Sequence, residues 1–115
     1  MSKSMANSMA WVKLDLNNPH FQQSLFALEK QAQFECLRTL KKISGMTWVM
    51  VYQDKGLRWE KISSIQAPAG IDQVYSIRIT LSGITLSARA LVFREGDFMR
   101  FLWVSQDHDG VYGKK

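Results

Sequence analysis

Four residues in the last third of the chain carry side chains that could take part in a reaction. They are Arg78, Arg89, His108 and Tyr112. An arginine guanidinium keeps its positive charge and can bind two phosphate oxygens at once. A histidine, with an unperturbed pKa of about 6.5, can give or take a proton near neutral pH. Side chains of these types could bind an anionic group and move protons.

Three of these residues also have a purely structural explanation. Arg78 and Arg89 alternate with apolar residues in strand-like segments, so either could be a solvated strand residue. His108 could be a loop histidine that is hydrogen-bonded to Asp107 or Asp109. Asp107, His108 and Asp109 are residues of types that bind metals. However, adjacent side chains point in different directions, and no second histidine or cysteine completes a ligand set. We therefore predict no metal site.

Composition and length exclude several classes of protein. The sequence has no phosphate-binding glycine loop and no serine-nucleophile elbow, and 115 residues cannot form separate dinucleotide and substrate domains, so we predict no cofactor. The single cysteine, Cys36, excludes an internal disulfide, and its place in a helical pattern predicts a packing role. No apolar run approaches the roughly 20 residues that cross a bilayer, and no signal peptide is evident. We expect a cytoplasmic protein without a membrane partner.

The positive charge is concentrated in the middle of the chain. The net charge is +5, and residues 30–61 hold seven basic and three acidic side chains. Lys55, Arg58 and Lys61 lie in this region, on a connection that the sequence predicts to be partly extended. Such a surface would attract a polyanion or an acidic partner protein. The alternative is an ordinary solvated surface.

The spacing of apolar residues predicts the elements that position these side chains. Asn18 and Pro19 form a helix-start signal, and two helices are predicted over residues 18–30 and 32–44. Their apolar faces are expected to consist of Phe21, Leu25, Leu28 and Ala32, and then of Phe34, Leu37, Leu40 and Ile43. Thr47 can cap a short third helix that ends at a left-handed Gly56, although a strand is the alternative there.

The remainder of the chain predicts a sheet. Residues 75–81 and 86–94 read as strands, Glu95-Gly96-Asp97 as a hairpin, and residues 98–105 as a central strand covered on both faces. The fold class is therefore α+β, with N-terminal helices packed on one face of a small, mainly antiparallel twisted sheet. We expect a flexible tail at 1–14, a single domain at 15–112 and a C-terminal tail at 113–115.

The order of these segments resembles a known family. Two helices and a basic connection precede Tyr-Ser-Ile-Arg-Ile (75–79), Ser-Ala-Arg-Ala-Leu-Val-Phe (87–93), a Glu-Gly-Asp turn, an apolar strand and Asp-His-Asp-Gly-Val-Tyr (107–112). This order resembles the RelE/ParE superfamily of bacterial toxins across residues 19–112. The connection between Arg78 and Arg89 is longer than is usual in that family, which leaves open whether the two arginines meet.

The resemblance implies the toxin half of a type II toxin–antitoxin pair, with a cognate antitoxin as partner. RelE-like members cut mRNA in the ribosomal A site without a metal, and ParE-like members instead poison DNA gyrase. Arg78 matches the position that contacts phosphate and Arg89 the position that stabilises the transition state. Tyr112 matches a tyrosine linked to proton transfer or base stacking, and His108 falls where a general acid or base would stand. The resemblance also implies that Lys55, Arg58 and Lys61 hold ribosomal RNA through its phosphates.

Overall fold

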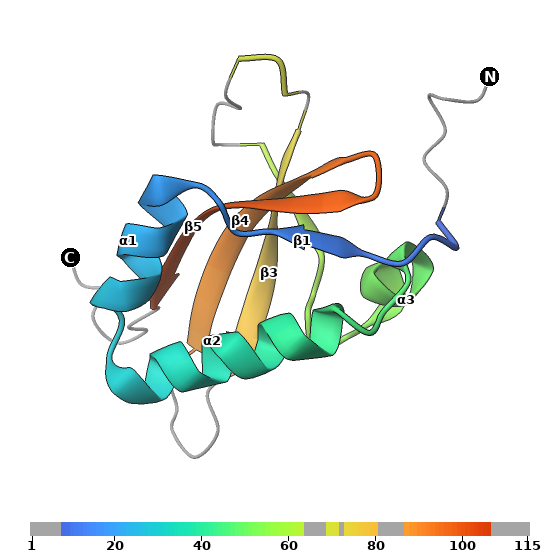
Figure 1. Ribbon diagram of the computed structural model, residues 1–115. Helices are drawn as coiled ribbons and strands as arrows, with labels where there is room; N and C mark the ends of the chain where they lie inside the picture. Colours follow the sequence, from blue (N-terminus) through green and yellow to red (C-terminus); the bar gives the residue numbers. More distant parts are fainter. Residues whose placement is uncertain (1–7, 64–68, 72, 81–86, 107–115) are drawn as a thin grey trace.

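The computed structural model describes residues 8–63, 69–71, 73–80 and 87–106 of the chain (Figure 1). Its elements in chain order are β1 (Lys13–Asp15), α1 (Pro19–Ala27), α2 (Lys30–Ile43), α3 (Trp48–Gln53), β2 (Glu60–Ile62), β3 (Val74–Thr80), β4 (Ser87–Glu95) and β5 (Phe98–Gln106). The strands form one sheet in the order β1-β5-β4-β3-β2. The α+β class is thus confirmed, and the sheet is mixed because β1 runs parallel to β5 while the other pairs are antiparallel.

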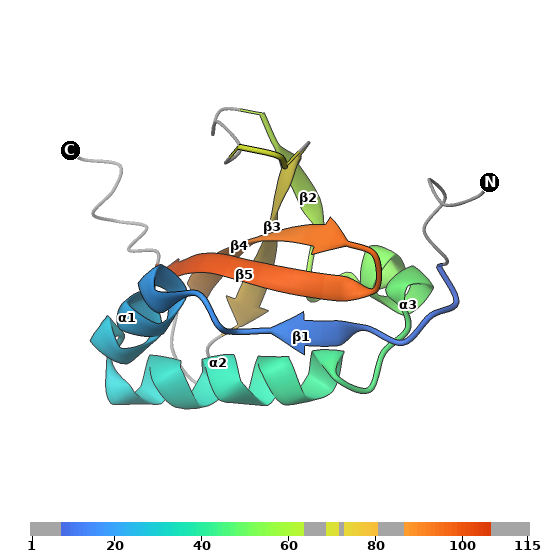
Figure 2. The same ribbon diagram turned by 45° about the horizontal axis from the view of Figure 1, so that its top comes forward.

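The two long helices follow from local signals and pack against the sheet. The side chain of Asn18 accepts hydrogen bonds from the backbone N–H groups of His20 (2.7 Å) and Phe21 (3.4 Å), which begins α1. Leu28 and Glu29 both have extended backbone angles, so the chain breaks there and α2 begins at the next residue. α1 contacts β5 and α2 contacts β3, and Figure 2 shows both helices along one side of the sheet.

The apolar face predicted for α2 is only half right. Leu40 and Ile43 are buried, but the side chains of Phe34 and Leu37 are 55% and 52% exposed. The helix instead buries a row of small and apolar residues, namely Ala32, Cys36, Leu40 and Ile43. These positions lie at spacings of four, four and three residues, so they share one face of the helix. Phe34 and Leu37 lie on the opposite face, which the sheet does not cover.

Cys36 lies in the middle of this buried row and is fully buried, as its predicted packing role requires. Burial raises the pKa of the Cys36 thiol to about 11, because a thiolate is poorly solvated there. We expect the native protein to react with a thiol reagent such as DTNB at least about 100-fold more slowly than the unfolded chain, since little thiolate forms and access is blocked. Stopped-flow DTNB kinetics with and without denaturant measure this ratio. Equal rates would contradict the burial.

The short helix α3 forms where it was predicted, but it ends differently. The Thr47 hydroxyl accepts a hydrogen bond from the backbone N–H of Met50 at 3.4 Å, which caps the helix. The predicted left-handed cap at Gly56 is wrong, because Asp54 is the C-cap and has extended backbone angles. The Asp54 carboxylate accepts a hydrogen bond from the backbone N–H of Leu57 at 2.8 Å and so closes the turn that follows.

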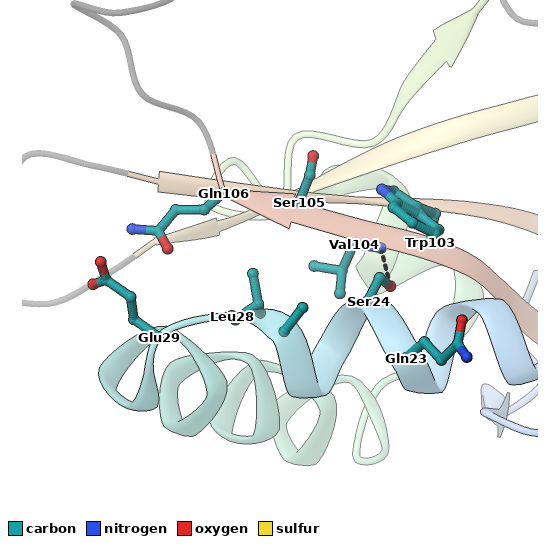
Figure 3. Close-up of a pocket in the computed structure, with 9 residues that line it drawn as sticks. Gln23, Ser24, Leu28, Glu29, Trp103, Val104, Ser105 and Gln106 are labelled. Carbon is teal, nitrogen blue, oxygen red and sulfur yellow. Dashed lines mark hydrogen bonds between the residues drawn. The ribbon is translucent and has the colours of Figure 1, made fainter.

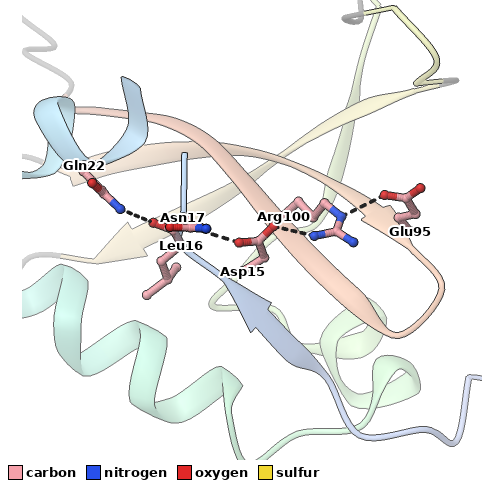
Figure 4. Close-up of polar contacts among 6 residues, drawn as sticks. All are labelled: Asp15, Leu16, Asn17, Gln22, Glu95 and Arg100. Carbon is pink, nitrogen blue, oxygen red and sulfur yellow. Dashed lines mark hydrogen bonds and ion pairs between the residues drawn. The ribbon is translucent and has the colours of Figure 1, made fainter. Parts of the chain in front are cut away.

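Residues 8–14, which the sequence placed in a flexible tail, are part of the fold. Val12 is 5% exposed and donates its backbone N–H to the carbonyl of Met46 at 2.9 Å. The Asp15 carboxylate of β1 binds the guanidinium of Arg100, whose Nε donates to Glu95 at 2.8 Å (Figure 4). Backbone pairing and this ion pair attach β1 to β5. Local sequence did not predict β1 because its partners lie far away in the chain.

The Asp15 carboxylate is also expected to make stability depend on acid pH. The backbone N–H of Asn17 and the Arg100 guanidinium lower the pKa of Asp15 below its usual value of 3.8. A carboxylate whose pKa is lower in the folded state stabilises the fold above its unfolded pKa, and this contribution is lost as pH falls through the folded pKa. We expect Asp15→Asn to lower the free energy of unfolding by about 1 kcal/mol at pH 7. Below about pH 3 the difference in free energy of unfolding between the variant and wild type should be smaller. Urea unfolding across this pH range tests it, and a constant difference at every pH would contradict it.

The strand β5 lies between β1 and β4, as a central strand does, but it is not covered on both faces. Phe98 and Trp103 are 37% and 44% exposed. The pairing with β4 shifts between Leu91, which lies opposite Trp103, and Val92, which lies opposite Phe101. This irregularity is typical of a β-bulge, which turns the following residues relative to the sheet. The predicted hairpin is present, with Gly96 at a φ of 62° that favours glycine.

Candidate functional site

The two arginines that the sequence selected lie directly opposite each other in the sheet. In the antiparallel pairing of β3 with β4, the α-carbon of Arg78 is the partner of the α-carbon of Arg89. Residues paired in this way project their side chains to the same side, with β-carbons about 4.5–5.5 Å apart. The neighbouring pair, Ile77 and Ala90, projects to the other side and is fully buried. The longer connection therefore does not keep the two arginines apart.

The same side of the sheet continues onto β5 with a serine and an exposed tryptophan. Ser105 is the register partner of Arg89, and Trp103 is that of Leu91. Figure 3 shows Trp103 and Ser105 projecting away from α1, whereas Val104 points toward it. We call the surface formed by Arg78, Arg89, Leu91, Trp103 and Ser105 the arginine face. It combines two guanidinium groups and a hydroxyl with a half-exposed aromatic ring.

The electrostatics of the arginine face favour an anionic ligand. Two guanidinium groups placed directly opposite each other in a sheet concentrate positive charge on one side of it, although Arg89 also has another interaction partner. Within the described part of the chain, the Arg78 guanidinium has no ion pair or side-chain hydrogen bond. Arg78 also lines a cleft of about 90 Å³ together with Thr39, Lys42, Gly56 and Leu57. Two guanidinium groups on one side of a sheet can bind the oxygens of one phosphate together.

The three other basic residues that the sequence selected do not form one cluster. Lys55 and Arg58 flank the segment whose Leu57 carbonyl accepts the backbone N–H of Arg78 at 2.6 Å. Arg58 has a φ of 50° and lies 3.7 Å from the Glu60 carboxylate, which offsets part of its charge. Lys61 pairs with Tyr75 and therefore projects to the side of the sheet opposite the arginine face. Lys55 and Arg58 thus flank the residue that is hydrogen-bonded to the backbone of Arg78, whereas Lys61 lies on the other side of the sheet.

His108 and Tyr112 lie outside the residues that the structure describes. In the sequence, His108 follows Ser105, the partner of Arg89, by three residues. The proton-transfer half of the predicted site therefore remains a prediction from the sequence.

Sequence reasoning did not select Trp103 and Ser105 as site residues. Trp48, Trp59 and Trp103 are the aromatic candidates for contact with a partner, and at least two of them are expected to pack in the core instead. Two of these tryptophans do pack internally. Trp48 is fully buried, and its ring centroid lies 5.6 Å from that of Trp59. The signal for Trp103 was its even spacing from Ser105, which places the two side chains on one side of a strand.

A hollow of about 500 Å³ lies between α1 and the outer edge of β5 (Figure 3). The Ser24 hydroxyl accepts a hydrogen bond from the backbone N–H of Val104 at 3.0 Å. The N–H of Val104 at this edge of the sheet therefore already has a partner. Nε2 of Gln106, which lines the hollow, is buried and has no hydrogen-bond partner among the residues that the structure describes. The hollow is mostly lined by small and apolar groups and carries no clustered charge. Its lining includes Trp103 and Ser105 of the arginine face, but neither of the two arginines.

The described residues contain no group of three or more histidine, cysteine, aspartate or glutamate side chains that could hold a metal ion. None of the described helices combines the length and the apolar character that a membrane span needs.

Comparison with known proteins adds no assignment, because no family model, no curated protein and no solved structure matches this chain.

Proposed function

We propose that the protein is the toxin of a type II toxin–antitoxin pair and acts as a metal-independent mRNA endoribonuclease of the RelE kind. The observation that carries this proposal is the register of β3 and β4, which pairs Arg78 with Arg89. The resemblance in sequence gives these two arginines the roles of phosphate contact and transition-state stabiliser. Both roles require the arginines to reach the same phosphate, and direct pairing on one side of the sheet permits this. The proposed partners are a cognate antitoxin, the ribosome and its mRNA.

The proposed reaction needs few groups from the protein. The ribose 2′-hydroxyl attacks the adjacent phosphorus and loses its proton, and the bond from phosphorus to the 5′-oxygen of the next nucleotide breaks. The products are a cyclic phosphate and a 5′-hydroxyl that has gained a proton. Arg78 and Arg89 would stabilise the negative charge that builds up on the phosphate oxygens. His108 and Tyr112 are the candidates for moving the two protons.

Trp103 would give the same face a way to hold a base beside the bound phosphate. Its side chain is 44% exposed and projects to the same side of the sheet as the two arginines. Aromatic side chains stack with RNA bases, and one such stack contributes about 1–3 kcal/mol to binding. Lys55 and Arg58, which flank the segment beside Arg78, would hold the backbone of ribosomal RNA through charge.

One observation favours a second function, in which the arginine face binds its target without cutting it. The five residues of the arginine face include no histidine or carboxylate, and Glu60, which the register places on the same side of the sheet, lies 3.7 Å from Arg58. Cleavage therefore depends on a group outside them, and His108 has acidic neighbours on both sides. Without that group the protein would be a binding module, either gyrase-poisoning or catalytically inactive.

The decisive experiment is induction of the protein in a bacterial culture, with mapping of mRNA ends in the same cells. We expect growth arrest and new 5′ ends inside translated messages. His108→Ala is expected to abolish the cuts at an equal protein level, which a blot verifies. Arrest without new ends would support the binding function and contradict the nuclease proposal. Normal growth at good expression would contradict both the nuclease and the gyrase-poisoning function, and would indicate an inactive toxin fold or a different family.

A further inference from the structure

The outer side of α2 has an unusual composition for a solvent-exposed helix surface. Phe34 and Leu37 are 55% and 52% exposed, although the opposite side of the same helix is fully packed. Lys30, Phe34, Leu37 and Lys41 follow one another at spacings of four, three and four residues, so they share one stripe. Two apolar side chains thus lie in line between two lysines.

The charge around this stripe is one-sided. Arg38 lies beside Phe34, with its guanidinium carbon 5.8 Å from the ring centroid, and its side chain is 63% exposed. The one acid of α2 is Glu35, whose side chain is 7% exposed and lies 3.8 Å from Arg38. Lys42 is matched by Asp54 at 3.1 Å. The outward charge of the stripe is therefore positive, and little of it is matched by acids within the described residues.

A hollow adjoins the stripe at its C-terminal half. It has a volume of about 550 Å³ and is lined by Phe34, Arg38, Lys41 and Lys42. An apolar side chain of a partner could enter this hollow against the ring of Phe34. The cations at the rim would then face acidic groups that flank the anchoring side chain.

We propose that the outer stripe of α2, formed by Lys30, Phe34, Leu37, Arg38 and Lys41, is a docking surface for an acidic amphipathic helix of a partner protein. Burial of Phe34 and Leu37 would supply affinity, and the cations would supply orientation and a fast association rate. Charge complementarity identifies the partner as acidic. This surface is separate from the arginine face, and the inference does not depend on the nuclease activity.

Other occupants fit the same residues less well. A nucleic acid would meet the cations, but the exposed Leu37 has no role in contacting phosphate, and Arg38 already lies over the ring of Phe34. A membrane-binding helix normally offers a broad apolar face to the lipid. Here the broad apolar face of α2 is buried against the rest of the fold, and only Phe34 and Leu37 remain outside.

Selection from a yeast-displayed library of random 20-residue peptides against the full chain tests this inference. We expect the enriched peptides to carry a net negative charge and apolar residues at helical spacing. Fluorescence anisotropy of a labelled enriched peptide is expected to show about 10-fold or greater weakening for Phe34→Ala and for Lys41→Glu. Lys13→Glu, a matched charge change at an exposed lysine of β1, should leave the affinity unchanged.

Several results would overturn the proposal. They are failure to enrich any peptide, enrichment of neutral or basic peptides, and binding that is insensitive to both α2 variants. Vesicles that contain phosphatidylserine and a single-stranded RNA are assayed in parallel. Binding of either probe that is lost with Phe34→Ala and Lys41→Glu, without acidic peptides being enriched, would assign the surface to a membrane or to RNA instead. Thermal unfolding midpoints near that of wild type ensure that the variants are folded.

Discussion

Replacing Arg89 with alanine is expected to lower the rate of mRNA cleavage by about 100-fold or more. A cation that stabilises charge only as it develops in the transition state contributes on the order of 10²–10³ in rate. Arg89 lies between Arg78 and Ser105 in the register of the sheet, so it is at the centre of the proposed phosphate site. Arg89→Lys should recover only part of the loss, because lysine retains the charge but not the two-pronged geometry.

The test of Arg89→Ala includes a control variant at another basic residue, and RNA binding is measured as well as the cleavage rate. Lys13→Met removes a positive charge from an exposed position on β1 and should cleave as wild type does. Arg78→Met should weaken RNA binding, whereas its free energy of unfolding should change by no more than about 0.5 kcal/mol, as is usual for surface substitutions. Cleavage on programmed ribosomes and urea unfolding provide the two measurements. Unchanged cleavage by folded Arg89→Ala would remove the arginine pair from the proposed mechanism.

Replacing Trp48 with alanine is expected to destabilise the fold by about 3–5 kcal/mol, the usual cost of removing a buried tryptophan. Trp48 is fully buried, and its Nε1 donates a hydrogen bond to the carbonyl of Asp97 at 3.0 Å. The guanidinium carbon of Arg94 lies 4.2 Å from the Trp48 ring centroid, and the Tyr52 ring centroid lies 5.8 Å away. The substitution would therefore remove contacts that join α3 to the β4–β5 turn.

Urea unfolding of two further tryptophan variants makes this test specific. Trp48→Phe keeps an aromatic ring but loses the hydrogen bond to Asp97, so we expect a smaller loss of about 1–3 kcal/mol. Trp11→Ala removes a side chain that is 63% exposed and should cost no more than about 0.5 kcal/mol. Equal losses for Trp48→Ala and Trp11→Ala would contradict the central role of Trp48 in packing. If Trp48→Ala does not fold, the comparison of Trp48→Phe with Trp11→Ala remains decisive.

The candidate site was predictable only in part. Arg78 and Arg89 could be selected from the sequence, because an arginine within an alternating strand is visible locally. Whether they meet could not be predicted, since the register depends on how two distant strands pair. Trp103 could not be selected from the sequence because it lies in an almost wholly apolar strand. Its ring is half exposed because the helices cover the other side of the sheet.

The sequence by itself determined the features that depend on neighbouring residues. Asn18 and Thr47 begin helices because their side chains bond to backbone groups two or three residues away, and Gly96 turns the hairpin through its own φ. The tertiary structure alone decided which face of α2 is buried and that β1 joins the sheet. It also decided that Arg78 faces Arg89. These outcomes depend on contacts between segments far apart in the chain, which local propensity and periodicity do not encode.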